Sequence, residues 1–290
     1  MKHLFIYIFM AFTIFSANAA DSGKSAILMV HFGTTFDDTR ALTIDAINSK
    51  AKEAFPGMDV VEAYTSRIVI KRLKERGVVK DTPREALLKL AAAGYSNVIV
   101  QSTNIIDGIE AAVLREECEY MSPFFKDLRV GRPLLYSVED GQQVADILSA
   151  AYPEAKNNAY LFVGHGTSTP ANAIYSQLDY MMDAQGRPDF TVTTVEGYPT
   201  MELSIRYLKQ LKAKSVTLVP LMFVAGDHAR NDIAGDMRSE LEANGFKAEA
   251  LVRGLGEMPE IQNLFIEHIR QAIEDKPLSP SEHKRKFLVQ

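Results

Sequence analysis

Two short stretches, one in each half of the chain, have nearly the same sequence pattern. The first runs from Ala26 to Thr35 and reads AILMVHFGTT, and the second runs from Ala159 to Ser168 and reads AYLFVGHGTS. Each is an apolar run that ends at a Gly-Thr turn, which is typical of a buried parallel strand. Ligands of open α/β sheets bind where such strands end, so these two turns are the first place to look for a site.

Strand-like and helix-like segments alternate along both halves. We expect strands at residues 26–31, 58–64, 97–101 and 128–135, and again at 160–163, 190–196, 215–219 and 247–252. Helical patterns lie between them, among them 37–55, 68–76, 109–121, 144–151, 170–182, 201–211, 232–244 and 259–273. This alternation predicts parallel sheets that are covered by helices on both faces.

The two halves can also be aligned at three places in the same order. Residues 30–34 match 163–167, residues 61–65 match 195–199, and the strand and loop at 98–108 match those at 216–226. Strand–helix units resemble one another in general, which is the alternative explanation. Three ordered matches favour an internal duplication. We therefore expect an α/β fold of two similar doubly wound parallel-sheet domains, residues 25–152 and 153–275, with a ligand cleft between them.

The first nineteen residues have the pattern of a secretory signal peptide. A short polar start precedes an apolar stretch at residues 4–15, and Ala17-Asn18-Ala19 fits the small-x-small rule for cleavage before Ala20. An uncleaved anchor or a buried first helix is the alternative, although the apolar run is short for a membrane span. We expect residues 1–19 to be removed and the protein to be exported, to the periplasm if the source is a Gram-negative bacterium.

Composition narrows the classes of function. The formal net charge is -5, which gives no basic surface for nucleic acid. Cys118 is the single cysteine, so the chain forms no internal disulfide and no thiolate metal cluster of its own. No Walker A sequence is present, and no stretch after the signal peptide is apolar enough to span a membrane. Residues 276–290 form a polar tail, and the oligomeric state stays open, a homo-oligomer included.

Two histidines and a glutamate fall at the predicted edge of the second sheet. His165 lies between two glycines after the first strand of that half, Glu196 ends the second strand, and His228 lies in the loop after the third. Two imidazoles and one carboxylate suit a borderline divalent metal such as cobalt, nickel, zinc or iron(II). The alternative is that His165 caps the following helix and that His228 pairs with a neighbouring aspartate. The shared edge of the sheet favours a metal site.

The other histidines carry weaker signals. His268 lies in the last predicted helix and His283 in the polar tail, and we expect both to be solvated. His31 stands one residue before the position that aligns with His165. It therefore either reaches the cleft or takes a core or capping position.

With these residues in place, the chain resembles the anaerobic sirohydrochlorin cobalt chelatases of the CbiK type, in the class II chelatase superfamily that includes ferrochelatase. The resemblance extends from about Ser25 to about Ala272. It is carried by FGTT at 32–35, EAYTS at 62–66, VQS at 100–102, GHG at 164–166, VEGYP at 195–199, PLMFVAGDHARND at 220–232 and GLGE at 254–257. The long segment around His228 is the most specific of them.

The resemblance implies a chelatase that inserts Co²⁺, with Fe²⁺ or Ni²⁺ as alternatives, into the tetrapyrrole sirohydrochlorin, as in cobalamin biosynthesis. It places the family's metal ligands on His165, Glu196 and His228, and it implies that His165 is the base. Insertion must remove two pyrrole N–H protons. A neutral imidazole with a pKa near 6.5 can accept a proton at neutral pH.

Two features depart from the family pattern. An exported copy would work away from cobalamin assembly in the cytoplasm, so a periplasmic haem- or metal-binding carrier without turnover is the alternative function. Some exported relatives are linked with haem through an extra histidine, but Thr103-Asn104 stand where that histidine is expected. The carboxylates of sirohydrochlorin need cationic or amide partners; the candidates, if they do not simply face solvent, are Arg67, Lys71, Arg115 and Arg230.

Overall fold

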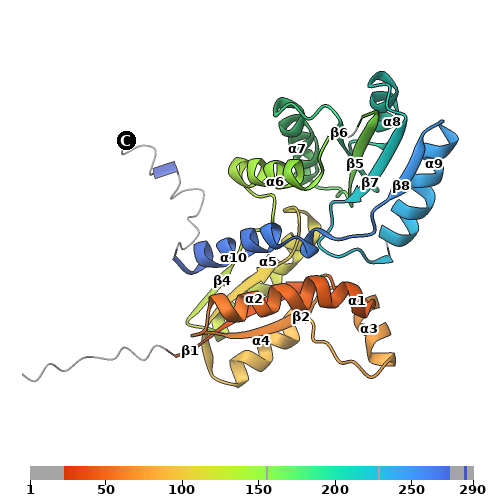
Figure 1. Cartoon of the computed structure of the whole chain (residues 1–290). Helices are drawn as coiled ribbons and strands as arrows, with labels where there is room; N and C mark the ends of the chain where they lie inside the picture. Colours follow the sequence, from red (N-terminus) through yellow and green to blue (C-terminus); the bar gives the residue numbers. More distant parts are fainter. Residues whose placement is uncertain (1–22, 155, 228, 275–283, 286–290) are drawn as a thin grey trace, which may run out of the picture.

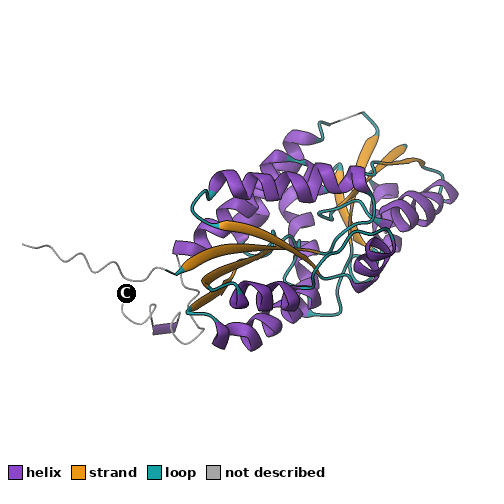
Figure 2. Cartoon of the chain, turned by 90° about the horizontal axis from the view of Figure 1, so that it is seen from below, coloured by secondary structure: helices purple, strands orange, loops and turns teal. Residues whose placement is uncertain are grey.

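The computed structural model describes residues 23–154, 156–227, 229–274, 284 and 285, which form two four-stranded sheets (Figure 1, Figure 2). The first sheet has the order β2-β1-β3-β4, from β1 (Lys24–His31), β2 (Asp59–Tyr64), β3 (Tyr95–Ser102) and β4 (Asp127–Val130). The second has the matching order β6-β5-β7-β8, from β5 (Asn158–Gly164), β6 (Phe190–Thr194), β7 (Ser215–Pro220) and β8 (Lys247–Ala250). All pairings among these strands are parallel. The predicted α/β fold with two similar sheets is confirmed.

Helices connect the strands in both halves. In the first half they are α1 (Asp37–Arg40), which continues through the wider turn η1 (Ala41–Asp45) into α2 (Ala46–Ala54), then α3 (Arg67–Glu75), α4 (Pro83–Ala92), α5 (Ile109–Met121) and α6 (Val138–Ala151). In the second they are α7 (Ala173–Ala184), α8 (Met201–Gln210), η4 (Ala229–Met237) leading into α9 (Arg238–Ala243), and α10 (Pro259–Glu274). Short 3₁₀ turns are η2 (Ser122–Phe124), η3 (Pro170–Asn172) and η5 (Leu255–Glu257).

Two element boundaries differ by five residues or more from the sequence prediction, and the strand predicted to end at Glu196 ends two residues earlier, at Thr194. The fourth strand ends at Val130 rather than at Leu135, because Leu135 leaves the sheet and pairs with Ile106 in the loop after β3. Helix α6 begins at Val138, six residues before the predicted start. Ser137 and Asp140 form a capping box there, in which each side chain accepts a hydrogen bond from the other residue's backbone N–H.

The two halves share one continuous apolar core. Its largest cluster of buried side chains includes Ile27 of β1, Phe162 of β5 and Phe265 of α10. Helix α6 packs against α7 of the second half, whereas α10 returns to pack against β3, β4 and α2 of the first half (Figure 1). Two further clusters cover the other faces of the two sheets separately. Each half is thus covered in part by a helix from the other half.

Several sequence predictions concern the two ends of the chain, which the structure describes only in part. The predicted signal peptide, residues 1–19, lies outside the described residues, and of the polar tail only Lys284 and Arg285 are described, both exposed. The domain limits 25–152 and 153–275 stay a prediction. Within the described residues, no helix combines the length and the apolar character needed to cross a membrane.

Candidate functional site

A cleft of about 510 Å³ lies where strands of both halves end. The first half contributes the turn after β1, the start of α3 and the loop from β3 into α5; the second contributes the turn after β5, the segment after β6 and the loop after β7. The strand order reverses between β1 and β3 in the first sheet and between β5 and β7 in the second. The cleft opens at these two points, where ligands of open α/β sheets bind. Gly108 of the first half faces Thr167 of the second across it, because a Cβ at position 108 would lie 3.3 Å from Thr167 Oγ1.

His165 lines this cleft at the end of β5 and is partly buried. The glycines on both sides let the turn pack closely: a Cβ at Gly164 would lie 2.1 Å from the ring of Tyr175, and Gly166 has a φ of 90°. The Nδ1 atom of His165 contacts the carbonyl oxygen of Gly166 at 3.3 Å. Since a carbonyl oxygen only accepts, Nδ1 is the donor in this contact.

Glu196 is the neighbour of His165 in the cleft lining and is exposed there. The backbone N–H of Glu196 donates to the carbonyl oxygen of His165 at 2.8 Å, and the N–H of Val195 donates to Gly164 at 2.9 Å. The turn at Gly166 packs directly on this strand end, since a Cβ at position 166 would lie 1.4 Å from the Glu196 carbonyl oxygen. The structure therefore brings two of the three predicted metal ligands together.

Asn172 links the two turns that carry His165 and Glu196. Its Oδ1 accepts from the backbone N–H of Thr167 at 3.1 Å, and its Nδ2 donates to the carbonyl oxygen of Tyr198 at 2.6 Å. One side chain thus sets the spacing between the turn after β5 and the segment after β6. Sequence reasoning missed Asn172, because its role depends on a contact with a residue 26 positions away.

His228, the third predicted ligand, lies outside the described residues. The residues before it in the same loop, Gly226 and Asp227, line the cleft, and Ala229 after it is fully buried in the second half. The described part of the chain contains no group of three or more His, Cys, Asp and Glu side chains close enough to hold a metal ion. That search did not include position 228, so the three-ligand set stays a prediction.

His31 takes the core position rather than a place in the cleft lining. Its side chain is 1% exposed, with Nδ1 at 3.1 Å from Thr103 Oγ1 and Nε2 at 3.0 Å from Asn48 Oδ1. Its ring also stacks on Phe223, with 6.1 Å between ring centroids. Both Thr103 and Phe223 line the cleft, so His31 supports the wall of the cleft from behind.

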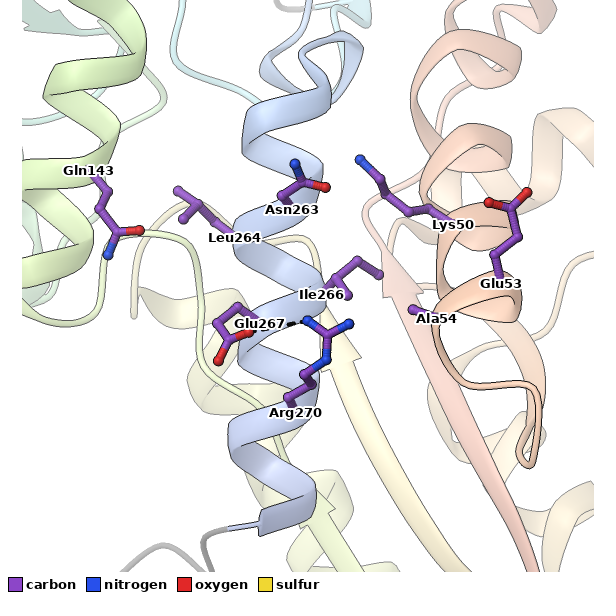
Figure 3. Close-up of a pocket in the computed structure, with 9 residues that line it drawn as sticks. All are labelled: Lys50, Glu53, Ala54, Gln143, Asn263, Leu264, Ile266, Glu267 and Arg270. Atoms are coloured by element: carbon purple, nitrogen blue, oxygen red, sulfur yellow. Dashed lines mark hydrogen bonds and ion pairs between the residues drawn. The ribbon is translucent and has the colours of Figure 1, made fainter.

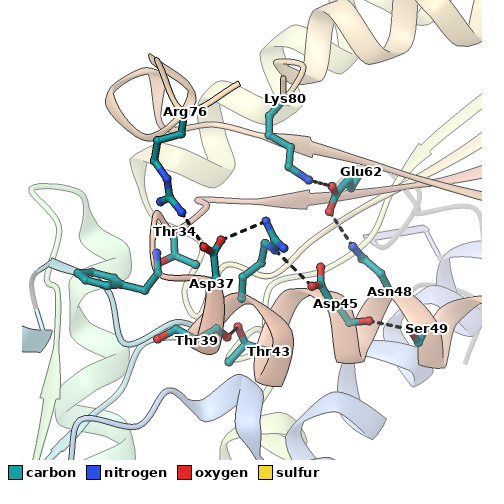
Figure 4. Close-up of polar contacts among 12 residues, drawn as sticks. Thr34, Asp37, Thr39, Thr43, Asp45, Asn48, Ser49, Glu62, Arg76 and Lys80 are labelled. Carbon is teal, nitrogen blue, oxygen red and sulfur yellow. Dashed lines mark hydrogen bonds and ion pairs between the residues drawn. The ribbon is translucent and has the colours of Figure 1, made fainter. Parts of the chain in front are cut away.

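A chain of polar contacts continues from His31 toward the surface. Asn48 donates to Glu62 at 2.9 Å, and Glu62 forms an ion pair with Lys80 (Figure 4). Because Asn48 donates through Nδ2, its Oδ1 accepts from Nε2–H of His31, so Nε2 carries a proton. Burial lowers the pKa of His31 to about 4, although the Glu62 carboxylate and the hydrogen bond to Asn48 act in the opposite direction.

The prediction that His268 is solvated is wrong. His268 is 2% exposed, and its Nε2 lies 3.0 Å from Oδ1 of Asp140 on α6. Burial acts to raise the pKa of Asp140, but hydrogen bonds from His268 and from the backbone of Ser137 outweigh it and lower this pKa. The pair joins α10 to α6 in the shared core, so it is structural.

No sequence motif pointed to the part of the cleft lining that comes from the first half. It consists mainly of hydroxyl and apolar side chains, with Asn104 and Glu110 as the amide and the carboxylate among them. Three of the apolar side chains are well exposed: Phe32 (44%), Ile68 (66%) and Ile109 (55%). Among the described lining residues none is lysine or arginine. The four cations suggested for substrate carboxylates therefore lie outside the lining, and two of them have other partners: Arg115 pairs with Asp107 and Arg230 with Asp38.

A second hollow of about 530 Å³ lies on the outside, between α2, α6 and α10 (Figure 3). Its lining residues are Lys50, Glu53, Ala54, Gln143, Asn263, Leu264, Ile266, Glu267 and Arg270. Lys50 donates to the Pro259 carbonyl oxygen at 3.0 Å, and Arg270 pairs with Glu267 at 3.3 Å. Its cations are thus occupied by local partners, and the chemistry of interest lies in the cleft.

Comparisons with known proteins agree with this geometry. A family model described as cobalt chelatase (CbiK) matches residues 25–274. The chain is 40% identical over 256 residues to the sirohydrochlorin cobaltochelatase of Salmonella typhimurium, covering 86% of this chain and 97% of that protein. It is 32% identical over 258 residues to the sirohydrochlorin cobaltochelatase CbiKC of Nitratidesulfovibrio vulgaris, covering 86% and 91%. The solved structure of SirB from Bacillus subtilis with Fe³⁺ has the same fold, with a TM-score of 0.63 at 14% identity and coverage of 87% and 96%.

Proposed function

The chain belongs to the cobalt chelatase (CbiK) family, and from this premise we propose that it is a sirohydrochlorin cobaltochelatase. It takes Co²⁺ and sirohydrochlorin as substrates, places the metal in the ring and releases two protons. Within the molecule, one observation supports this proposal: His165 and Glu196 line the same cleft between the halves, and a backbone hydrogen bond joins them.

His165, Glu196 and His228 are the proposed metal ligands. Imidazole and carboxylate donors suit a borderline divalent cation such as Co²⁺. The support from the structure is the shared lining position of His165 and Glu196, together with the cleft position of Asp227 next to His228 in the sequence. The carboxylate of Glu196 lowers the net charge of the bound cation and so eases its transfer to the ring.

His165 is also the proposed base. Its Nε2 lone pair holds the metal before transfer, and the same lone pair becomes available when the cation moves to the pyrrole nitrogens. It can then accept one of the two protons that leave those nitrogens, so metal and proton change places on one atom. The divalent cation favours the deprotonated ring, and the cleft holds ring and metal face to face.

The first half shapes the cleft for the macrocycle. Phe32, Ile68 and Ile109 offer exposed apolar surface to the ring, where burial of apolar area contributes about 25 cal/mol per Å². The hydroxyl groups of Thr35 and Thr167, both partly exposed in the lining, can donate to those substrate carboxylates that lie inside the cleft. The remaining carboxylates extend toward the cations outside the lining.

Export to the periplasm is part of the same proposal. Its support is the apolar stretch at residues 4–15 followed by Ala17-Asn18-Ala19. Osmotic-shock fractionation should release the protein with the periplasmic contents, and N-terminal sequencing should begin at Ala20. Retention of residues 1–19 on the purified protein would contradict export by cleavage.

The direct test is metal insertion by the purified protein. Sirohydrochlorin mixed with Co²⁺ and the protein should show the absorbance change of the metallated ring far faster than without the protein. His165→Ala and His228→Ala should each reduce the rate by a factor of about 100 or more, because each removes a metal ligand, and His165→Ala also removes the base. His283→Ala, in the polar tail, is the control and should keep the full rate. Unchanged rates in both the His165 and the His228 variant would rule out the proposed site.

A further inference from the structure

One hydrogen-bond donor in the cleft lining has no acceptor. Nδ2 of Asn104 is buried and forms no hydrogen bond with any described residue. Asn104 lies in the loop between β3 and α5, and it belongs to the cleft lining. Nearly all buried N–H groups in folded proteins are paired, because an unpaired one costs free energy. An unpaired donor at a ligand cleft therefore points to an acceptor that the ligand supplies.

The backbone that carries Asn104 is held on both sides. The N–H of Thr103 donates to the carbonyl oxygen of Val30 at 2.9 Å, and the carbonyl oxygen of Asn104 accepts from the N–H of Leu134 at 2.9 Å. Oγ1 of Thr103 also lies 3.1 Å from Nδ1 of His31 behind the cleft wall. The side-chain amide of Asn104 is thus the unpaired part of a segment whose backbone is fixed.

The amide of Asn104 can reach the cleft without any movement of this backbone. The residue as a whole is only partly buried, and a half-turn about its Cβ–Cγ bond exchanges the positions of Nδ2 and Oδ1. This torsion is soft, and no hydrogen bond of Nδ2 opposes the turn. A ligand with a strong acceptor can therefore draw the amide N–H groups toward itself at little cost.

The chemistry of the cleft indicates which acceptor this is. A metal-free tetrapyrrole offers ring nitrogens and peripheral carboxylates, and the ring nitrogens receive the metal, whose proposed ligands His165 and Glu196 belong to the second half. Asn104 belongs to the first half. The described lining contains no lysine or arginine, and its acidic residues are Glu110, Glu196 and Asp227. A carboxylate inside this cleft depends on neutral donors, and hydrogen bonds to a charged acceptor are the stronger ones.

We infer that Asn104 binds a peripheral carboxylate of the tetrapyrrole through its side-chain amide and so helps to select a carboxylated ring as substrate. The inference rests on the proposed function, since it takes this cleft as the tetrapyrrole site. An uncharged donor has a further advantage here. A lysine or arginine in the lining would repel the incoming Co²⁺, whereas an amide binds the carboxylate without doing so.

Two substitutions at this position test the contact. Asn104→Leu keeps the branched shape but removes the donor, so the Kd for metal-free sirohydrochlorin, measured by absorbance titration of the full protein, should rise about tenfold. Asn104→Asp replaces the donor by a negative charge and should raise this Kd by about 50-fold, because it also repels the substrate carboxylate. Both variants should bind Co²⁺ at least as tightly as the wild type, since neither removes a proposed ligand.

Thermal unfolding of the ligand-free protein gives a readout that a structural asparagine would not give. Asn104→Leu removes a buried group without a partner, so the midpoint of unfolding should stay equal or rise by about 2 °C. Asn48 is the contrast, because it accepts from His31 and donates to Glu62. Asn48→Leu breaks both bonds and should lower the midpoint by about 5 °C.

Ser149 on α6 provides a matched control. Its Oγ is also buried without a partner, but Ser149 does not belong to the cleft lining. Ser149→Ala should therefore leave the Kd for sirohydrochlorin unchanged. If both Asn104 variants bind sirohydrochlorin as tightly as this control, or if Asn104→Leu lowers the midpoint of unfolding as Asn48→Leu does, the contact is refuted.

Fully esterified sirohydrochlorin separates the charge of the substrate from its shape. Its carbonyl oxygens still accept but carry no charge, so the roughly fivefold difference in Kd between Asn104→Asp and Asn104→Leu should disappear with the ester. A difference that persists with the ester would overturn the assignment to a carboxylate. A wild-type protein that binds sirohydrochlorin but never metallates it overturns the proposed function, while these Kd values still decide on Asn104. A wild-type protein that does not bind sirohydrochlorin overturns both.

Discussion

The backbone N–H of Glu196 donates a 2.8 Å hydrogen bond to the carbonyl oxygen of His165. This bond continues the pairing of β5 with β6 for one step beyond the sheet, where Gly164 pairs with Thr194. The two proposed ligands are therefore in fixed register, set by the sheet itself rather than by side-chain contacts. Anything that separates these two backbones should affect metal binding before it affects the rest of the fold.

Gly166→Ala should separate them. The added Cβ would lie 1.4 Å from the Glu196 carbonyl oxygen, and the φ of 90° is unfavourable for alanine. We expect a loss of most Co²⁺ affinity, together with a loss of unfolding free energy of about 3 kcal/mol. Gly186→Ala is the matched control, because its φ is 84° but no atom lies within 4 Å of the added Cβ. It should cost about 1 kcal/mol and leave Co²⁺ binding unchanged; equal effects of the two variants would contradict this account.

The buried neutral His31 should make the fold sensitive to mild acid. Its pKa is about 4 in the folded protein and near 6.5 when unfolded, so the unfolded chain binds more protons in between. Stability should therefore fall as the pH drops from about 6.5 to 4, by on the order of 3 kcal/mol from this residue. Urea unfolding at several pH values checks this. His31→Gln keeps a hydrogen-bonding side chain without titrating and should flatten the curve; parallel curves for variant and wild type would exclude the effect.

Asp140 should add a second loss of stability in acid, at lower pH than the loss that comes from His31. Its pKa is lowered in the folded protein, so its contribution is full above its unfolded pKa of about 3.9 and is lost as the pH falls through the folded value. Asp140→Asn breaks the buried contact with His268 and should cost about 3 kcal/mol at pH 7. The control is Glu139→Gln on the exposed side of the same helix, expected to cost less than about 0.5 kcal/mol. A similar loss of thermal stability in both variants would show that the buried pair adds nothing.

The exposed apolar side chains of the cleft should matter for the ring and not for the metal. Ile68→Ala and Phe32→Ala remove apolar surface from the lining, so KM for sirohydrochlorin should rise about three- to tenfold in each. The Kd for Co²⁺ should stay constant. Val79→Ala changes an equally exposed residue outside the lining and should alter neither constant. An unchanged KM in both cleft variants would mean that the macrocycle binds elsewhere.

The sequence was sufficient for the architecture because the apolar runs and helical periods are local signals. The order of strands in the first half repeats in the second, as the three aligned segments predicted. His165 and Glu196 could be assigned to one edge, since His165 follows β5 directly and Glu196 lies two residues after the end of β6 in the same parallel sheet.

The misjudged features depend on partners far away in the sequence. His268 is buried because Asp140, 128 positions earlier, faces it across the core. The fourth strand is short because Leu135 pairs with Ile106 instead of continuing the sheet. The first-half lining has mainly hydroxyl and apolar side chains that look ordinary in sequence, and only the meeting of two halves gives them a common surface.

The placement of α6 and α10 has a consequence for any attempt to produce one half alone. Here β3 and β4 are covered by α10 from the far end of the chain, while α6 covers α7 of the following half. A fragment cut at residue 152 would therefore expose the apolar residues of the first sheet that α10 covers in the full chain. Such a fragment should aggregate rather than fold, so the two halves have to be produced as one polypeptide.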